Sequence, residues 1–310
     1  MKLAFVFPGQ GSQKVGMANW VKDSQAAEAV MQAADRALNE PLSELIANGP
    51  DTDLNLTVNT QPALLATSYA VFEAWREAGG SMPEVMAGHS LGEYTALTAA
   101  GVFKLEDAVR LVRFRANAMQ SAVAVGVGGM AAVLGLSDEV VVDICAKAKG
   151  EELVEAVNFN CPGQVVIAGH KAAVQRACEL ALEAGAKRAV ALAVSAPFHS
   201  ALLQPAAQEL SGELARTEMK EPAVDVVANV DVLCHKSVDE IRNALAKQAA
   251  SPVLWTGCVR KMREMGVTHV VECGPGRVLS GLVRRIAPEI TVANVSDLES
   301  IKSVIEQLNA

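Results

Sequence analysis

The sequence predicts an α/β protein in which a large doubly wound domain is interrupted by a small inserted domain. Short β-rich runs alternate with amphipathic helical stretches near both ends of the chain, whereas the middle follows a different order of elements. Apolar residues, mostly Ala, Val and Leu, make up 51% of the 310 residues, and aromatic residues make up only 4%. This composition is typical of sheets that are covered by helices on both faces.

The β-rich runs of the large domain are expected to form one largely parallel sheet. They are Leu3–Phe7, Val85–Gly88, Val224–Val230, His269–Cys273 and Ile290–Val295. Helical periodicity between them predicts helices at Gln61–Ala78, Leu105–Val123, Ala201–Arg216 and Ile241–Gln248. This βα alternation predicts a doubly wound body.

The middle of the chain begins with a glycine-rich stretch, Val123–Gly129, which we interpret as a hinge. Helices are expected near Asp138–Lys149 and Ala172–Ala184, with β-rich runs before, between and after them. The resulting order, βαββαβ, is that of a ferredoxin-like unit. We therefore divide the chain into a discontinuous large domain, residues 1–125 and 196–310, and a small domain, residues 126–195.

Charge and cysteine spacing exclude several classes of function. The net charge of -8 argues against nucleic-acid binding, and no apolar run is long enough to span a membrane. The first apolar run stops at Pro8 without a small-residue cleavage site, so we expect a cytoplasmic protein. The 6 cysteines contain no C-x-x-C pair, and we expect neither disulfides nor a metal site.

A first motif, "FVFPGQGSQ" at Phe5–Gln13, ends an apolar run in proline and two glycines. It fits neither a dinucleotide-binding loop, which needs G-x-G-x-x-G, nor a Walker loop, which needs glycine before its lysine. The glycines are therefore expected to allow a close approach of the backbone to another group.

A second motif, "GHSLG" at Gly88–Gly92, matches the G-x-S-x-G nucleophile elbow of proteins with an α/β-hydrolase-like core. A strand leads into it and a helix, Leu91–Ala100, leads out of it. This context predicts that Ser90 stands exposed at the carboxyl edge of the sheet. The alternative is that Ser90 is an ordinary N-cap, with Glu93 completing a capping box.

Two further residues are candidates for the same site. His199, in "VSAPFHS", follows a strand and a proline turn, a place from which a loop histidine can act as base for a serine. Arg115 shares the inward stripe of its helix with Val112 and Met119, and an inward arginine needs an anion. The sequence leaves open whether that anion belongs to a substrate or to a glutamate.

Several collinear motifs together resemble the malonyl-CoA:acyl carrier protein transacylases of type II fatty acid synthesis, over the whole chain. The motifs are "FPGQGSQ", "GHSLGEY", R-x-x-x-M-Q at Arg115–Gln120, "GGMAAVLGL", "NFNCPGQVVIAG", "PFHS" and "ECGPGRVLSGL". The chain departs from the usual family pattern at Ala116, at Cys161 and in "SAVAVG", which lacks a common proline. None of these departures touches an expected catalytic position.

The resemblance implies a ping-pong transfer of malonyl from malonyl-CoA to the phosphopantetheine thiol of acyl carrier protein, without a metal or redox cofactor, for fatty acid elongation. It implies that Ser90 is the nucleophile, His199 the base and Arg115 the partner of the malonyl carboxylate. The main-chain carbonyl of Gln248 would orient His199. The main-chain amides of Gln10 and Leu91 would form the oxyanion hole, and Met119, Met130 and Asn160 would line the cleft.

The alternatives to an acyltransferase are a serine hydrolase and a non-catalytic module that docks a carrier protein. A serine hydrolase is disfavoured because more than a hundred residues follow His199, and a non-catalytic docking module is disfavoured because all three site residues are present. The acidic carrier protein would need a local basic patch on this acidic chain. The candidates are two basic pairs, Lys187–Arg188 and Arg284–Arg285.

Overall fold

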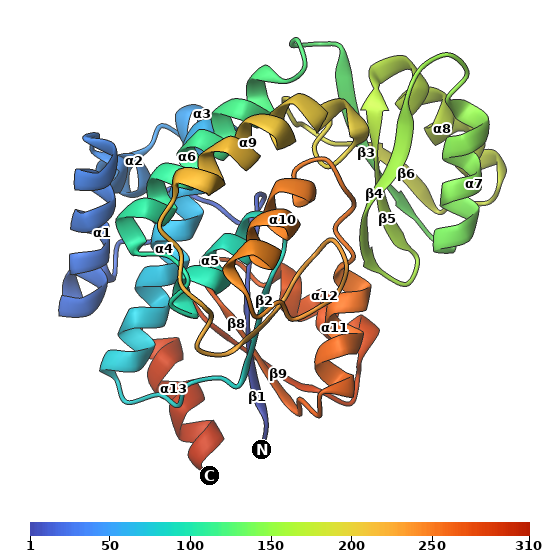
Figure 1. Cartoon of the computed structure of the whole chain (residues 1–310). Coiled ribbons are helices and arrows are strands. Elements are labelled where there is room, and N and C mark those ends of the chain that lie inside the picture. Colours follow the sequence, from blue (N-terminus) through green and yellow to red (C-terminus); the bar gives the residue numbers. More distant parts are fainter.

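The computed structural model describes residues 1–310 and contains two separate sheets, each with its own helices (Figure 1). The large sheet consists of β1 (Leu3–Phe7), β2 (Val85–Gly88), β7 (Asp225–Val227), β8 (His269–Cys273) and β9 (Thr291–Val295). Its strand order is β7-β2-β1-β8-β9, and every pair is parallel. The predicted parallel sheet is thus confirmed.

One strand of this sheet is shorter than expected. The sequence predicted Val224–Val230, but β7 ends at Val227. Beyond it the chain turns back, with Ala228 N–H donating to the Leu233 carbonyl at 2.9 Å. This early turn places Asn229 behind the end of β2, where its side chain contacts the turn that carries Ser90.

The predicted helices are present with shifted ends. Pro62 lies inside α4, which begins before it, and the stretch predicted as Ala201–Arg216 starts with a short 3-10 helix. The helices of the large domain are α1 (Gln25–Leu38), α2 (Leu42–Asn48), α3 (Asp51–Leu54), α4 (Thr57–Glu77), α5 (Leu91–Ala99), α6 (Leu105–Ser121), α9 (Gln204–Arg216), α10 (Val238–Gln248), α11 (Trp255–Glu264), α12 (Val278–Ile286) and α13 (Leu298–Asn309), with 3-10 turns η1 (Val21–Asp23) and η2 (Ala201–Leu203). No helix is both long enough and apolar enough to cross a bilayer.

Helices cover both faces of the large sheet, as the alternation along β1 shows. Leu3, Phe5 and Phe7 belong to one core cluster, which includes residues of α1, α4, α6 and α9. Ala4 and Val6 belong to another, which includes residues of α11 and α12. Since successive side chains of a strand point to opposite faces, β1 is buried on both sides.

The small sheet contains β3 (Gly128–Leu134), β4 (Val154–Cys161), β5 (Gln164–His170) and β6 (Arg188–Ala191). Its order is β4-β5-β3-β6 and its pairs are antiparallel. With α7 (Asp138–Ala148) and α8 (Lys171–Glu183), this gives the expected βαββαβ unit. The exact division of the chain at residues 126 and 195 stays a prediction.

Main-chain hydrogen bonds join β4 of the small sheet to the segment that precedes α11 of the large domain. Val253, in the segment before α11, donates to the Val157 carbonyl at 2.8 Å and accepts from Phe159 N–H at 3.0 Å. Asn160 of β4 also contacts His89, the residue after β2, with 2.8 Å between Oδ1 and Nε2. The edge of the small sheet therefore lies beside the carboxyl end of β2.

The turn between β2 and α5 is packed so closely that it requires two glycines. A Cβ on Gly88 would lie 1.9 Å from the carbonyl carbon of Gly92, and one on Gly92 would lie 2.0 Å from the Phe7 carbonyl oxygen. Both contacts are with main-chain atoms, which cannot move aside as a flexible side chain can.

We predict that Gly88→Ala lowers the free energy of unfolding by about 1–3 kcal/mol or more, the usual effect of overpacking. Gly212→Ala, in α9, is the matched control because nothing lies within 4 Å of its added Cβ. That variant should gain about 0.4–1 kcal/mol. Urea unfolding of both proteins checks this, and equal free energies of unfolding would contradict the packing argument.

Candidate active site

Ser90 occupies a sharp turn at the carboxyl end of β2 and has an unusual backbone conformation. Its φ is 53° and its ψ is −107°, in a region that costs most residues about 1–3 kcal/mol. Its hydroxyl makes no capping bond to α5. The capping-box alternative is therefore wrong, and the Ser90 side chain is free for other contacts.

The proline–glycine loop after β1 packs directly against this turn. A Cβ on Gly9 would lie 2.5 Å from the His89 carbonyl oxygen, so the close approach expected of this glycine is to the serine turn itself. Gly11 has a φ of 104°, which favours glycine. The loop thereby brings the Gln10 main chain beside Ser90.

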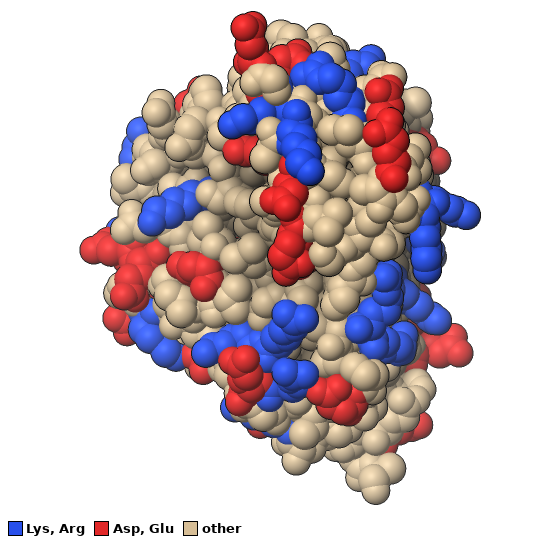
Figure 2. All heavy atoms as spheres, turned by 90° about the vertical axis from the view of Figure 1, so that its right-hand side faces the viewer, with Lys and Arg blue, Asp and Glu red and all other residues tan.

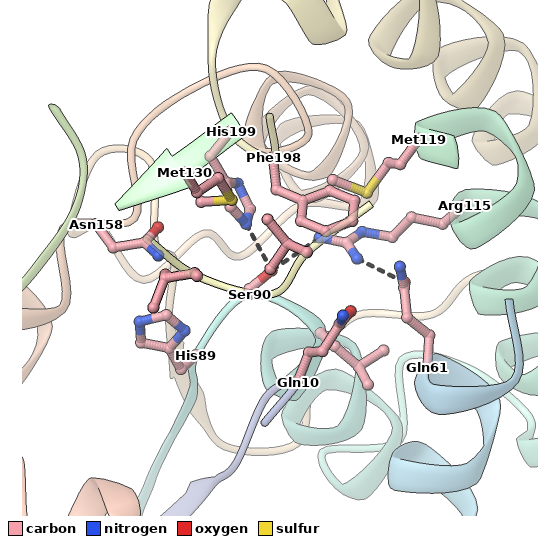
Figure 3. A pocket seen from close by; sticks show the side chains of 13 residues that line it. Gln10, Gln61, His89, Ser90, Arg115, Met119, Met130, Asn158, Phe198 and His199 are labelled. Atoms are coloured by element: carbon pink, nitrogen blue, oxygen red, sulfur yellow. Dashed lines mark hydrogen bonds between the residues drawn. The ribbon is translucent and has the colours of Figure 1, made fainter. Parts of the chain in front are cut away.

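His199 lines the same pocket as Ser90, and its ring points toward the Ser90 hydroxyl (Figure 3). Its Nε2 lies 2.7 Å from Ser90 Oγ, and its Nδ1 lies 2.8 Å from the Gln248 carbonyl oxygen. A carbonyl oxygen only accepts, so Nδ1 carries the proton and Nε2 is left to accept from the Ser90 hydroxyl.

Arg115 reaches the same hydroxyl from α6 and is 1% exposed. Its Nη2 donates to Ser90 Oγ at 3.0 Å and to Gln248 Oε1 at 2.9 Å, and its Nη1 donates to Gln61 Oε1 at 2.6 Å. The guanidinium also stacks over Tyr94, 5.2 Å from the ring centre.

No carboxylate forms an ion pair with Arg115. Its Nε–H also has no hydrogen-bond acceptor. The protein thus buries a cation among neutral amides and supplies no carboxylate of its own to pair with it.

Two main-chain donors line the pocket beside Ser90. The N–H groups of Gln10 and Leu91 have no acceptor within the protein, whereas the N–H of Ser90 is taken by Asn229 Oδ1 at 2.7 Å. Leu91 begins α5, where unpaired N–H groups favour negative charge. The geometry offers two donors to an oxygen held in this pocket.

The pocket has a volume of about 130 Å³ and is lined by residues of both the large and the small domain. Met119 of α6 and Met130 of β3 line it, as expected. Asn160 does not line it: its Oδ1 lies 2.8 Å from the Nε2 of His89, which does line the pocket. Asn158, on the same strand, lines the pocket instead (Figure 3).

Burial and charge shift the pKa values of the site. Burial, together with the nearby Arg115 cation, lowers the pKa of His199 to about 3. Burial raises the pKa of Glu93 to about 7, although Gln248 and Asn229 donate hydrogen bonds to it. His199 is therefore neutral in the unliganded protein and able to accept a proton.

Sequence reasoning missed Gln61, Asn229 and the Gln248 side chain, and it considered Glu93 only as a capping residue. Gln61 and Asn229 lie in segments whose local pattern indicates only a helix or the end of a strand. Their roles arise from contacts across the sheet edge, which no local pattern encodes. The inward position of Arg115, in contrast, is confirmed by its burial beside Val112 and Met119.

Comparisons with known proteins identify the family of the chain. Residues 4–307 match the family model of the acyl transferase domain. The malonyl CoA-acyl carrier protein transacylase of Haemophilus influenzae is 48% identical over 99% of both chains. The acyl-carrier-protein S-malonyltransferase structure of Burkholderia pseudomallei is 54% identical, with a TM-score of 0.97 over 99% of this chain and 100% of that one.

A further solved structure holds a malonyl-transacylase in complex with a type II polyketide acyl-carrier protein. It is 45% identical, with a TM-score of 0.97 over 99% of this chain and 100% of that chain. Fold, serine turn and full-length similarity thus lead to one conclusion: the chain belongs to the acyl transferase family, among the malonyl-CoA:acyl carrier protein transacylases.

Proposed function

We propose that this acyltransferase moves a malonyl group from malonyl-CoA to the phosphopantetheine thiol of an acyl carrier protein through an ester of Ser90. One observation carries the proposal. A buried guanidinium without a carboxylate partner lies 3.0 Å from the serine hydroxyl. A malonyl group brings both a thioester for Ser90 and a carboxylate for Arg115.

In the first half-reaction Ser90 Oγ attacks the thioester carbon while His199 Nε2 takes the hydroxyl proton. The new C–O bond forms and the oxygen of the thioester becomes negative, next to the free N–H groups of Gln10 and Leu91. The C–S bond then breaks, and the CoA sulfur leaves with the proton from His199. This cycle leaves a malonyl ester on Ser90.

The second half-reaction runs in reverse with another thiol. The carrier's thiol gives its proton to His199 Nε2 and its sulfur attacks the ester carbon. The C–O bond breaks and Ser90 Oγ recovers the proton. Since the Gln248 carbonyl fixes the proton on Nδ1, the same nitrogen serves both directions.

Selectivity for malonyl follows from the planar fork of Arg115. Gln61 and Gln248 hold its two terminal nitrogens, so the fork keeps one orientation. A carboxylate bound by such a fork places the thioester carbon in a defined position relative to Ser90. Lysine offers charge without that geometry.

The two alternative functions predict different chemistry at the same serine. A hydrolase would release free malonate rapidly without an acceptor thiol, and a docking module would gain no malonyl mass at all. The cytoplasmic location expected from the sequence stays a prediction.

For the carrier protein, we propose a docking surface at one end of the small sheet. Arg188 pairs in register with Leu134, and Leu134 pairs with Gln164. Arg285 of α12 donates to Gln164 Oε1 at 2.9 Å, so the two basic pairs lie at the same end of this sheet. The face turned to the viewer in Figure 2 carries Lys and Arg in separate groups, with Asp and Glu between them.

The two pairs differ in how freely they can meet a partner. Lys187 and Arg188 are exposed, and their side chains make no hydrogen bond or ion pair. Arg284 and Arg285 donate to main-chain carbonyls of Val292 and Pro162. Charge reversal at Lys187 and Arg188 therefore breaks no hydrogen bond within the protein, unlike charge reversal at the second pair.

We predict that Arg115→Ala loses roughly 10²–10³-fold in kcat/KM for malonyl-CoA, since removing one member of a desolvated charge pair costs on the order of 2–5 kcal/mol. Acetyl-CoA should be loaded as well as before or better, because no unpaired guanidinium then lines the pocket. Arg115→Lys should fall between the two proteins. The ratio of malonyl to acetyl loading rates, measured by intact mass in the three proteins, checks this prediction.

Ser90→Ala is the control for this measurement, because it keeps the fold and removes only the attacking hydroxyl. It should gain no malonyl mass with either substrate. If Arg115→Ala lowers malonyl and acetyl loading by the same factor, Arg115 is structural and the carboxylate is recognised elsewhere.

His199→Ala should slow both half-reactions by about 10²–10⁴-fold, the usual contribution of one general base. Since the neutral imidazole is the active form and its pKa is lowered to about 3, the acid limb of kcat/KM should lie well below the ordinary histidine pKa of 6.5. Arg115→Ala removes a nearby positive charge, so it should move that limb to higher pH. A limb at the same pH in both proteins would exclude His199 as its source.

The docking proposal predicts that Lys187→Glu with Arg188→Glu slows transfer to the carrier protein in a salt-dependent way and spares loading from malonyl-CoA. The matched control is Lys22→Glu with Lys302→Glu, which makes the same charge change on η1 and α13. Steady-state rates with fatty acid and polyketide carrier proteins check it. Equal loss of both half-reactions would refute the surface.

A further inference from the structure

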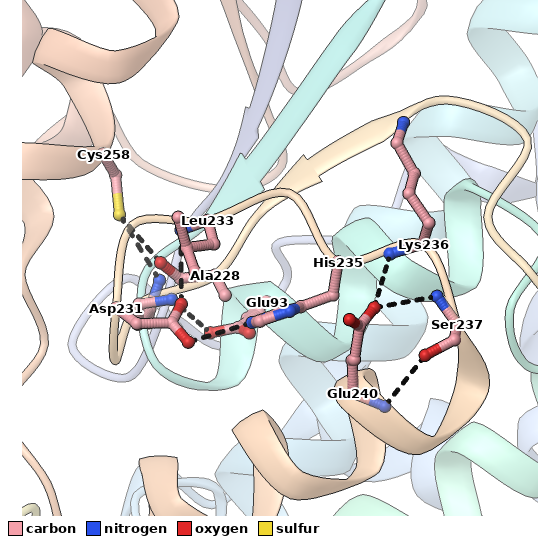
Figure 4. Close-up of polar contacts among 10 residues, drawn as sticks. Glu93, Ala228, Asp231, Leu233, His235, Lys236, Ser237, Glu240 and Cys258 are labelled. Atoms are coloured by element: carbon pink, nitrogen blue, oxygen red, sulfur yellow. Dashed lines mark hydrogen bonds and ion pairs between the residues drawn. The ribbon is translucent and has the colours of Figure 1, made fainter.

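Glu93 is a buried acid that the reaction just described does not use. It is the third residue of α5 and is 2% exposed. In a capping box its side chain would return to the Ser90 main chain, but here it turns inward. It lies beside the loop that runs from Ala228 to Ser237 (Figure 4).

One oxygen of this carboxylate accepts two hydrogen bonds. Glu93 Oε2 accepts from the main-chain N–H of Asn229 at 3.0 Å and from Gln248 Nε2 at 2.8 Å. The other oxygen, Oε1, makes no hydrogen bond. The two donors come from segments far apart in sequence, one after β7 and the other at the end of α10.

Asn229 in turn holds the strained serine turn from both sides. Its Oδ1 accepts from Ser90 N–H at 2.7 Å, and its Nδ2 donates to the Gly88 carbonyl at 2.7 Å. A shift of Asn229 would therefore move the residue that carries the hydroxyl.

Gln248 holds the remaining groups. Its carbonyl accepts from His199, its Oε1 accepts from Arg115, and its Nε2 donates to the Ser90 carbonyl at 3.0 Å as well as to Glu93. Gln248 thus links the histidine through its main-chain carbonyl, and the arginine and the serine turn through its side chain.

We infer that Glu93 is a positioning residue of the acyl transfer, whose Oε2 fixes the serine turn relative to the His199–Arg115 pair by holding Asn229 and Gln248 together. The inference rests on the proposed function of Ser90, His199 and Arg115. It concerns acceptor geometry: any side chain that places an oxygen where Oε2 lies will serve.

This geometry makes a sharp distinction between two variants. Glu93→Gln keeps an oxygen for both donors and puts its amide nitrogen where Oε1 makes no bond. Glu93→Ala leaves both donors buried and unpaired. A misplacement of about 1 Å at a reacting centre is enough to cost on the order of 10²-fold in rate.

The matched control is Glu272, which is also fully buried and also accepts two N–H groups. They belong to Leu279 at 3.0 Å and Ser280 at 2.7 Å, in the first turn of α12. None of these residues lines the Ser90 pocket. Glu272→Ala therefore reproduces the loss of a buried double acceptor without touching the reacting groups.

The experiment measures kcat and KM for loading of malonyl and acetyl groups onto Ser90, with thermal unfolding of each variant. We expect Glu93→Ala to lose roughly 10²-fold in kcat for both substrates with little change in KM. Glu93→Gln should stay close to the unsubstituted protein. Glu272→Ala should lower the unfolding temperature and leave kcat unchanged.

Two outcomes would overturn the inference: equal loss of kcat in Glu93→Ala and Glu272→Ala, or a loss in Glu93→Gln as large as in Glu93→Ala. If Glu93→Ala does not fold, Glu93→Asp takes its place, since its oxygen is withdrawn by one methylene; unchanged kcat there also overturns the inference. Failure of the unsubstituted protein to become malonylated refutes the proposed function instead.

Discussion

The strained turn at Ser90 is the constraint on which the rest of the site depends. A φ of 53° is unfavourable for serine, and it persists only because its surroundings determine it completely. Gly88 and Gly92 allow main chains to meet where a Cβ would clash, and Asn229 bonds the turn on both sides. In return, the turn raises the hydroxyl above the sheet edge and leaves the Leu91 N–H without an acceptor.

The second organising feature is the charge arrangement around Arg115. The cation is surrounded by Gln61, Gln248 and Tyr94, all of them neutral, while the acid Glu93 is hydrogen-bonded to the Gln248 amide and not to Arg115 itself. A carboxylate directly on Arg115 would have satisfied the protein and closed the site to an anionic substrate. Polar but uncharged partners fix the guanidinium without pairing its charge, as the proposed binding of a malonyl carboxylate requires.

The sequence predicted the framework closely because the framework rests on local patterns. β1, β2 and β8 have the expected bounds, and the βαββαβ unit has the expected order, since periodicity and turn residues are encoded nearby. Ser90 and His199 were identifiable from their turns. The helices α1, α11 and α13 were not singled out. Gln61 and Asn229 were missed and Glu93 was considered only as a cap, because their contacts span 54, 139 and 136 positions. Asn160 was predicted to line the cleft, but its side chain contacts His89 and does not line the pocket.

The low pKa of His199 depends in part on the unpaired positive charge of Arg115. Burial lowers the pKa of His199 most, and the positive charge of Arg115 lowers it further. A carboxylate that binds Arg115 neutralises this second contribution, so the imidazole becomes a stronger base when a malonyl group is in place. An acetyl group on Ser90 would bring no carboxylate, so in the proposed reaction it would leave the cation unpaired and the pKa of His199 low. In the proposed reaction, the arginine would therefore favour the malonyl substrate twice, once by binding its carboxylate and once by allowing His199 to accept the serine proton. This double effect needs the guanidinium close to both Ser90 and His199, which is the arrangement that the Gln248 side chain and carbonyl together impose.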